Sequence, residues 1–408
     1  MDPVLQALVV IAVLLLIGAL GEFIFLRTGV PDVVWLVAAG ILAGPVLNIV
    51  SPKVLQPGVP IFGAIALTVI LSGGAYRLRL AEVAAAAPRA LSLGILGFVF
   101  SVAAMCAYLW LATYLEFVRP ATVLHWVMVG AIVGGTSALV IMPTIAKSPV
   151  DPRVGRTLDV ESSSTDALCV VMAMVLIDLL VTGEADVSRP IIALAKGVGI
   201  GIALGVAITA VLIPLVPALR DKPHGFTVFL ASMLALYAIA NHAGGNGAVA
   251  VLASALLLGN ASTIMPKLIP GARAQAFTNT DVSRIMQEQM SFLVKSFFFF
   301  LIGLMFPTDL RLIALGAAAA LFLLAFRVPA VVLAMLGQGL SRKQLRLLVV
   351  TMPRGLAAGV LATLPQHMGV PGVENLSAAV FATIVTTILL FAIGFALVNR
   401  MPEEKKPK

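Results

Sequence analysis

Two carboxylates and a cluster of hydroxyl groups lie at the start of a long apolar stretch. Residues 157–169 read TLDVESSSTDALC, and almost all of the residues that follow are apolar. A carboxylate inside a membrane span is costly, so it is read as functional by default. Asp166 lies about ten residues beyond Arg156, the last loop charge, and therefore on the order of 15 Å into the predicted helix. A solvated or capping position at the membrane surface is the alternative for Glu161 and Asp159, but Asp166 is too deep for it.

Asp166 and Ser162 have the residue types and the spacing to bind a monovalent cation. They are one helical turn apart, so a helix presents the carboxylate and the hydroxyl on one face. Hard cations prefer oxygen ligands, and backbone carbonyls at Gly135 and Thr136 are expected to complete the shell. A buried carboxylate without a counter-charge can take up a proton and release it when a cation binds. Competition for one carboxylate predicts an electroneutral exchange of one cation for one proton.

The composition identifies a membrane protein. Of 408 residues, 60% are hydrophobic and 11% charged, and the mean hydropathy is +1.08. Such a chain cannot present a water-soluble surface, which indicates an all-α polytopic membrane protein. Windows of roughly 20 apolar residues give about thirteen transmembrane helices. The predicted spans are 4–26, 33–50, 60–76, 90–115, 123–146, 158–183, 190–216, 225–241, 246–263, 289–306, 310–336, 344–366 and 375–399.

Positive charge is distributed according to membrane topology. Most Lys and Arg residues outside the spans fall in loops on one side, which places the N-terminus outside and the C-terminus in the cytoplasm. The net charge of +8 is therefore a topology signal, and no nucleic-acid partner is expected. Cys106 and Cys169 both fall inside predicted spans and are expected to be packing residues. No His-Glu-x-x-His motif occurs, so neither a transition metal nor a cofactor is expected.

Cationic residues inside the predicted spans differ in depth. Lys196 lies near the end of its span, and its side chain is expected to extend to the membrane interface. Lys295 could extend to the interface in the same way, and it is also kept as a further candidate for the site. Arg327 lies well within its span and needs an anionic or carbonyl partner. Glu161 is its natural counter-charge, because a buried pair costs less than either charge alone.

Two predicted spans are interrupted in their middle. One contains Gly134-Gly135-Thr136-Ser137 and the other Met352-Pro353-Arg354-Gly355. Such residues free backbone groups that a neighbour, water or an ion must satisfy. The two interruptions are about 220 residues apart, as are spans four and eleven, which is typical of an inverted-repeat transporter with its site at mid-membrane.

Motifs in several spans together resemble a known family. They are Gly134-Gly135-Thr136-Ser137, Glu161-Ser162 with Thr165-Asp166, Gly245-Asn246-Gly247 with Leu258-Gly259-Asn260, Lys295-Ser296-Phe297-Phe298-Phe299 with Ile302-Gly303-Leu304, and Pro353-Arg354-Gly355. They resemble the monovalent cation:proton antiporter superfamily, and most closely the NhaP-like sodium/proton antiporter branch. The likeness runs in order from about span three to span twelve.

The resemblance implies a role for each matched residue. Asp166 matches the aspartate that binds cation and proton in turn. Glu161 matches a glutamate that is paired with an arginine, here Arg327. Arg354 lies at the second interruption, where it is expected to offset a helix C-terminal dipole or a nearby acid. Oxygen ligands for the ion are expected from Ser162 and Thr136.

Two positions depart from the NhaP-like pattern. Asparagine usually precedes the essential aspartate, and here Thr165 does. The first interruption usually reads Thr-Asp-Pro, and here it reads Thr136-Ser137-Ala138. The site thus lacks one carboxylate and one amide, so Thr165 and Ser137 are expected only to support ion binding. These departures affect the choice of cation more than the transport chemistry.

The resemblance also implies a homodimer with a NhaA/NhaP-like inverted repeat, in which two broken helices cross at mid-membrane. One transporter unit is expected over 1–400, followed by a short cytoplasmic tail at 401–408. The unit divides into a scaffold and dimer bundle, a linking helix and an ion-transporting core. Their ranges are about 1–80 with 225–306, 190–216, and 90–183 with 310–399, respectively.

The expected function is alternating-access exchange of a monovalent cation for H⁺ across the inner membrane of a prokaryote. Na⁺ is the first expected cation, with K⁺ or Li⁺ in its place as the alternatives. A K⁺/H⁺ antiporter, a K⁺ efflux transporter of the same superfamily, and a membrane sensor that does not transport are the other readings. A channel needs a continuously lined pore, whereas this sequence shows one isolated site, so a channel is not expected. An enzyme is not expected, because an aspartyl hydrolase needs a second acid and Asp178 lies about three turns from Asp166.

Overall fold

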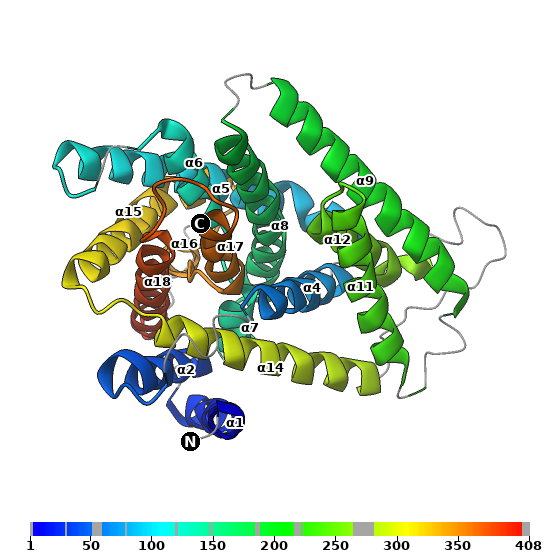
Figure 1. Ribbon diagram of the computed structural model, residues 1–408, viewed down its shortest axis with the longest axis horizontal. Helices are drawn as coiled ribbons and strands as arrows, with labels where there is room; N and C mark the ends of the chain where they lie inside the picture. The colour runs from blue at the N-terminus through cyan, green and yellow to red at the C-terminus, as the bar shows by residue number, and fades with distance from the viewer. Residues whose placement is uncertain are drawn as a thin grey trace. The chain divides into compact units, whose positions relative to one another are not determined.

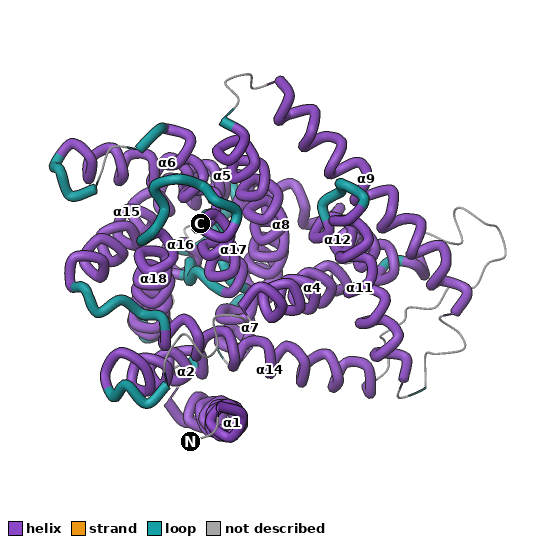
Figure 2. The backbone as a smooth tube through the Cα atoms, viewed as in Figure 1, coloured by secondary structure: helices purple, strands orange, loops and turns teal. Residues whose placement is uncertain are grey.

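The computed structural model describes residues 3–28, 31–50, 59–77, 80–118, 121–146, 148, 150–183, 188–215, 222, 224–263 and 281–401. Within these residues all regular structure is helical and no strand occurs, which confirms the all-α prediction (Figure 2). Seven of the described helices are long and apolar enough to cross a membrane by length and composition, and shorter apolar helices accompany them. The count of about thirteen spans stays a prediction.

Contacts divide the chain into two compact units. The first comprises Met1–Val59, Pro88–Gly183 and Lys295–Lys408, and the second comprises Pro60–Ala87 and Glu184–Val294. All of the predicted site residues lie in the first unit. The predicted division into a static scaffold and a moving core concerns motion, and it stays a prediction.

The second unit contains most of α4 (Val59–Arg77), together with α9 (Ser188–Leu212), η3 (Ile213–Leu215), α11 (His224–His242) and α12 (Gly247–Gly259) (Figure 1). α9 packs along α12, and polar contacts connect the two helices at two levels. The Asn246 N–H donates to the Gly197 carbonyl at 2.9 Å, and the Thr209 and Ser254 hydroxyls lie 2.9 Å apart. These contacts satisfy polar groups between two apolar helices.

The first unit contains two helices that are interrupted by extended backbone. α6 (Val123–Ile132) and α7 (Ala138–Ala146) are separated by residues 133–137, which we call the first break. α16 (Arg342–Val350) and α17 (Leu356–His367) are separated by residues 351–355, the second break. The Ser137 N–H donates to the Pro353 carbonyl at 2.9 Å, so the two breaks are in contact. Both interruptions occur where the sequence predicted them, whereas the inverted-repeat relation stays a prediction.

α8 (Pro152–Thr182) contacts both broken helices. It packs against α6, α7, α16 and α17 (Figure 1). The Asp151 side chain accepts a hydrogen bond from the Arg153 N–H at 2.8 Å, Pro152 takes the first helical position, and Gly183 ends the helix at φ +63°. The helix therefore begins six residues before the predicted span 158–183. Asp166 lies about 21 Å along it from its first residue.

Other helices complete the first unit. α15 (Leu310–Ala334) is capped by Asp309, whose side chain accepts a hydrogen bond from the Arg311 N–H at 2.8 Å, and α16 begins with a capping box of Ser341 and Gln344. α15 packs against α18, and α1 packs against α2. The remaining bounds are α1 (Pro3–Thr28), α2 (Asp32–Ile41), η1 (Leu42–Val46), α5 (Leu80–Tyr114, mostly in this unit), α14 (Asp281–Leu304, its end in this unit) and α18 (Leu376–Asn399).

Many large apolar side chains are more than half exposed on the helices. Examples are Leu16 on α1, Ile95 and Trp110 on α5, and Ile393 on α18. So many exposed large apolar side chains are unfavourable in water and suit contact with lipid. The chain is a multi-pass membrane protein.

Candidate ion-binding site

Asp166 lies on α8 with its side chain half-buried. Ser162, one turn earlier, and Thr165 are both fully buried. Within the described part of the chain, the Asp166 carboxylate has neither a hydrogen bond nor an ion pair. A carboxylate in this setting is free to bind a proton or a cation, because no fixed group competes for its oxygens.

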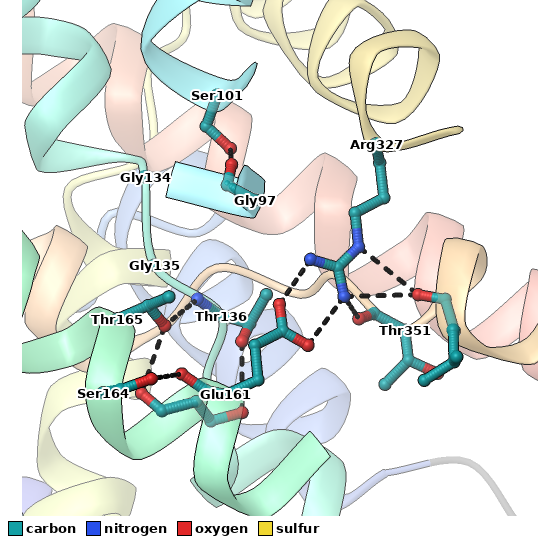
Figure 3. A network of polar contacts seen from close by, with 12 residues as sticks. Gly97, Ser101, Gly134, Gly135, Thr136, Glu161, Ser164, Thr165, Arg327 and Thr351 are labelled. Atoms are coloured by element: carbon teal, nitrogen blue, oxygen red, sulfur yellow. Dashed lines mark hydrogen bonds and ion pairs between the residues drawn. The ribbon is translucent and has the colours of Figure 1, made fainter. Parts of the chain in front are cut away.

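Hydroxyl groups connect the first break to α8 beside Asp166. The Thr136 backbone N–H donates to the Thr165 Oγ1 at 3.3 Å, and the Thr136 and Ser162 hydroxyls lie 3.1 Å apart. The Thr165 hydroxyl donates in turn to the Ser162 carbonyl at 3.2 Å. Figure 3 shows Thr136 and Thr165 facing each other across this contact. The structure thus brings together Asp166, Ser162, Thr165 and Thr136, which the sequence singled out.

Glu161 and Arg327 form a buried ion pair (Figure 3). Two parallel hydrogen bonds connect them, from Arg327 Nη1 to Glu161 Oε1 and from Nη2 to Oε2 at 2.8 Å. Arg327 also donates to the carbonyls of Leu348 at 3.3 Å and Thr351 at 3.4 Å. Glu161 is fully buried and is not a solvated surface group. Two-point contact with a carboxylate is the geometry that arginine favours.

Gly97 on α5 leaves room for this pair. A Cβ atom at Gly97 would lie 3.0 Å from Arg327 Nη1 and 3.6 Å from Glu161 Oε1. Any larger residue at position 97 would therefore press on the guanidinium group. α5 thus passes the ion pair at close range, which no sequence motif indicated.

Arg354 extends from the second break into the first. Its Nη1 donates to the carbonyls of Gly134 at 2.8 Å and Gly135 at 2.6 Å, directly after the end of α6. Arg354 is fully buried, and its positive charge at the C-terminus of α6 offsets that helix dipole. The Gly135 carbonyl, expected from the sequence to be a cation ligand, accepts one of these hydrogen bonds, and its role as a ligand stays a prediction.

Two other candidates have their described contacts outside α8. Ser137 is buried with its side chain against Gly355 of the second break, and its N–H donates to that break. Lys295 on α14 forms an ion pair with Asp32, the first residue of α2. Lys295 therefore does not simply extend to the interface, because a buried carboxylate lies within its reach. The sequence showed Asp32 as a charge before an apolar run, without indicating its partner.

Comparison with known proteins identifies the family. The sequence profile described as sodium/hydrogen exchanger, transmembrane, matches residues 10–398. The K(+)/H(+) antiporter NhaP2 of Shewanella sp. (strain ANA-3) is 28% identical over 400 residues, which cover 93% of this chain and 64% of that protein. This chain thus spans slightly less than two thirds of that relative's length. The Na(+)/H(+) antiporter 1 of Methanocaldococcus jannaschii is 25% identical over 197 residues, 48% of this chain and 45% of that protein.

The fold is also similar to a solved structure. The sodium proton antiporter MjNhaP1 from Methanocaldococcus jannaschii at pH 8 superimposes with a TM-score of 0.77 and 20% identity, covering 97% of this chain and 98% of that one. This likeness shows the fold. Because the profile match covers nearly the whole chain, the protein belongs to the sodium/hydrogen exchanger family, as the NhaP-like resemblance indicated.

Proposed function

We propose that this chain is a secondary antiporter that exchanges a monovalent cation for H⁺ at Asp166. The observation that supports this most is the contrast between the two acids of α8. Glu161 is neutralised by Arg327, whereas Asp166 is half-buried and has no fixed partner among the described residues. One unpaired carboxylate beside hydroxyl oxygens can bind either a cation or a proton, but not both.

The hydroxyl groups of Ser162 and Thr136 complete the proposed site with Asp166. They lie 3.1 Å apart, so one hydrogen bond between them must rearrange when both oxygens turn to a cation. Thr165 supports the first break through the Thr136 N–H, and the Ser137 N–H connects the first break to the Pro353 carbonyl of the second break. Alternating access then requires the two broken helices and α8 to move together past the remaining helices.

The cation is Na⁺ or K⁺ in this proposal. Relatives matched over 93% of this chain are named K(+)/H(+) antiporters, whereas the Methanocaldococcus jannaschii relative, matched over 48%, is named an Na(+)/H(+) antiporter. Sodium was the first expectation from the sequence, and the longer matches favour giving potassium equal weight. The protein acts as a homodimer in the inner membrane of a prokaryote, with its N-terminus outside and its C-terminus in the cytoplasm.

Replacing Asp166 with Asn tests the proposal. In proteoliposomes with an internal pH dye, the wild type should respond to Na⁺, K⁺ or Li⁺ but not to choline. Asp166→Asn should lose the response, because an amide neither titrates nor neutralises a cation. Asp178→Asn is the matched control, since Asp178 is an exposed acid on the same helix. Transport by Asp166→Asn at the wild-type rate would refute the proposal. A folded wild-type protein that responds to no cation would favour a sensor.

Exchange should be electroneutral, because Asp166 is the one unpaired carboxylate of the proposed site and Glu161 is paired with Arg327. Clamping the liposome membrane potential with valinomycin at different K⁺ gradients should leave the initial Na⁺-driven rate unchanged. If the exchanged cation is K⁺, valinomycin cannot be used because it carries K⁺ itself. Transport currents are then measured on a solid-supported membrane, and no steady current is expected. A current that reverses with potential in the absence of ion gradients would show that charge moves in each cycle.

A further inference from the structure

Arg354 is a charged side chain surrounded by neutral oxygens. Its Nη1 contacts the two carbonyls of the first break, and its Nη2 donates to the Ser101 Oγ at 3.0 Å. No carboxylate is hydrogen-bonded to it among the described residues, and its Nε is buried without a partner. The guanidinium group therefore depends on three neutral acceptors for its position, and Ser101 is the only side chain among them.

Ser101 is oriented so that it must accept this hydrogen bond. Its hydroxyl donates to the Gly97 carbonyl on the same helix at 2.7 Å. A serine hydroxyl has one proton, so its remaining capacity is as an acceptor, which suits the Arg354 Nη2. Hydrogen bonds in such a series strengthen one another. Ser101 and Gly97 appear together in Figure 3, one turn apart on α5.

The backbone of Arg354 is fixed separately from its side chain. Its N–H donates to the Thr387 hydroxyl of α18 at 3.0 Å, and the neighbouring Pro353 carbonyl accepts the Ser137 N–H. With the main chain fixed, the side chain alone decides whether Nη1 remains on the Gly134 and Gly135 carbonyls. Those carbonyls directly precede Thr136, whose hydroxyl faces Ser162.

We propose that Ser101 is a positioning residue for cation binding, acting through Arg354. By fixing the guanidinium group on the first break, Ser101 fixes the backbone that presents the Thr136 hydroxyl to the site. It also holds a positive charge against the Gly134 and Gly135 carbonyls, which disfavours a cation at those oxygens. This inference rests on the proposed exchange at Asp166, and it adds a residue that does not touch the ion.

Ser101→Ala should raise the cation KM about tenfold with little change in maximal rate, because it removes one hydrogen bond to a charged group. Ser101→Thr keeps the hydroxyl and should remain near wild type. Ser101→Cys keeps the size but weakens the hydrogen bond, and it should give a smaller rise. Ser92→Ala, a serine on the same helix about two and a half turns before Ser101, should leave the KM unchanged.

The experiment is a cation titration of exchange in proteoliposomes, normalised to folded protein by size-exclusion chromatography. Arg354→Lys lacks the guanidinium fork, so adding Ser101→Ala to it should change the KM less than in the wild type. A wild-type protein that exchanges no cation would refute the function at Asp166. An active wild type whose KM is unchanged by Ser101→Ala and Ser101→Cys would refute only the role of Ser101. A Ser101→Ala protein that folds in lower yield but has an unchanged KM would likewise refute the role of Ser101.

Discussion

Glu161→Gln should destabilise the protein by about 3–5 kcal/mol, because it leaves the Arg327 charge buried without a counter-charge. The pair is fully enclosed, with Leu348 and Thr351 carbonyls as the other acceptors of Arg327. Neutral carbonyls cannot replace a carboxylate that meets the guanidinium at two points. The measurement is the apparent Tm in detergent, together with the yield of monodisperse protein.

Two further variants test whether the lost stability comes from the unpaired charge of Arg327. Glu161→Gln combined with Arg327→Met removes both charges and should recover most of the lost stability, since neither charge is then left alone. Asp178→Asn, an exposed acid on the same helix, should have almost no effect. A Glu161→Gln protein as stable as the wild type would contradict the buried pair.

Gly355→Ala should destabilise the crossing of the two breaks by about 3 kcal/mol and abolish transport, because its new methyl group would overlap the Ser137 side chain. The overlap cannot relax easily, since the Ser137 N–H is bonded to the Pro353 carbonyl at 2.9 Å. The measurement is folded yield and thermal stability, followed by exchange in proteoliposomes.

Ser137→Gly should rescue Gly355→Ala, because it removes the side chain that the methyl group meets. Ser137 directly precedes α7, and glycine at such a helix start costs only a few tenths of a kcal/mol relative to serine. Gly199→Ala is the control for a new methyl group, since nothing lies within 4 Å of that position. A double variant no better than Gly355→Ala would show that the overlap is not the cause.

The features that were predictable from the sequence depend on local chemistry. Gly134 and Gly135 weaken a helix, and Pro353 removes a backbone donor, so both breaks followed from residue types. Glu161 and Arg327 could be paired because each needed an opposite charge in an apolar setting. The start of α8 was placed too late, because hydropathy treats Arg153 and Arg156 as loop residues. The Asp151 cap and Pro152 in fact begin the helix before them.

The features that were not predictable depend on which helices meet. Arg354 donates its hydrogen bonds to backbone carbonyls and one serine. Because these partners are neutral, no charged residue in the sequence indicates them. Asp32 and Lys295 are 263 residues apart, and nothing local to either residue indicates the other. Ser137 was assigned to the ion site from its place in a motif. Its side chain faces Gly355 because the two breaks cross, which is a tertiary fact.

Proton release on cation binding tests the central claim most directly. Purified protein in weakly buffered detergent solution is titrated with Na⁺ or K⁺ while the bulk pH and the bound cation are followed together. If cation and proton compete for Asp166, the wild type should release one proton for each cation bound, and Asp166→Asn should release none. Cation binding without proton release, or equal release from Asp166→Asn, would contradict a shared carboxylate at this position.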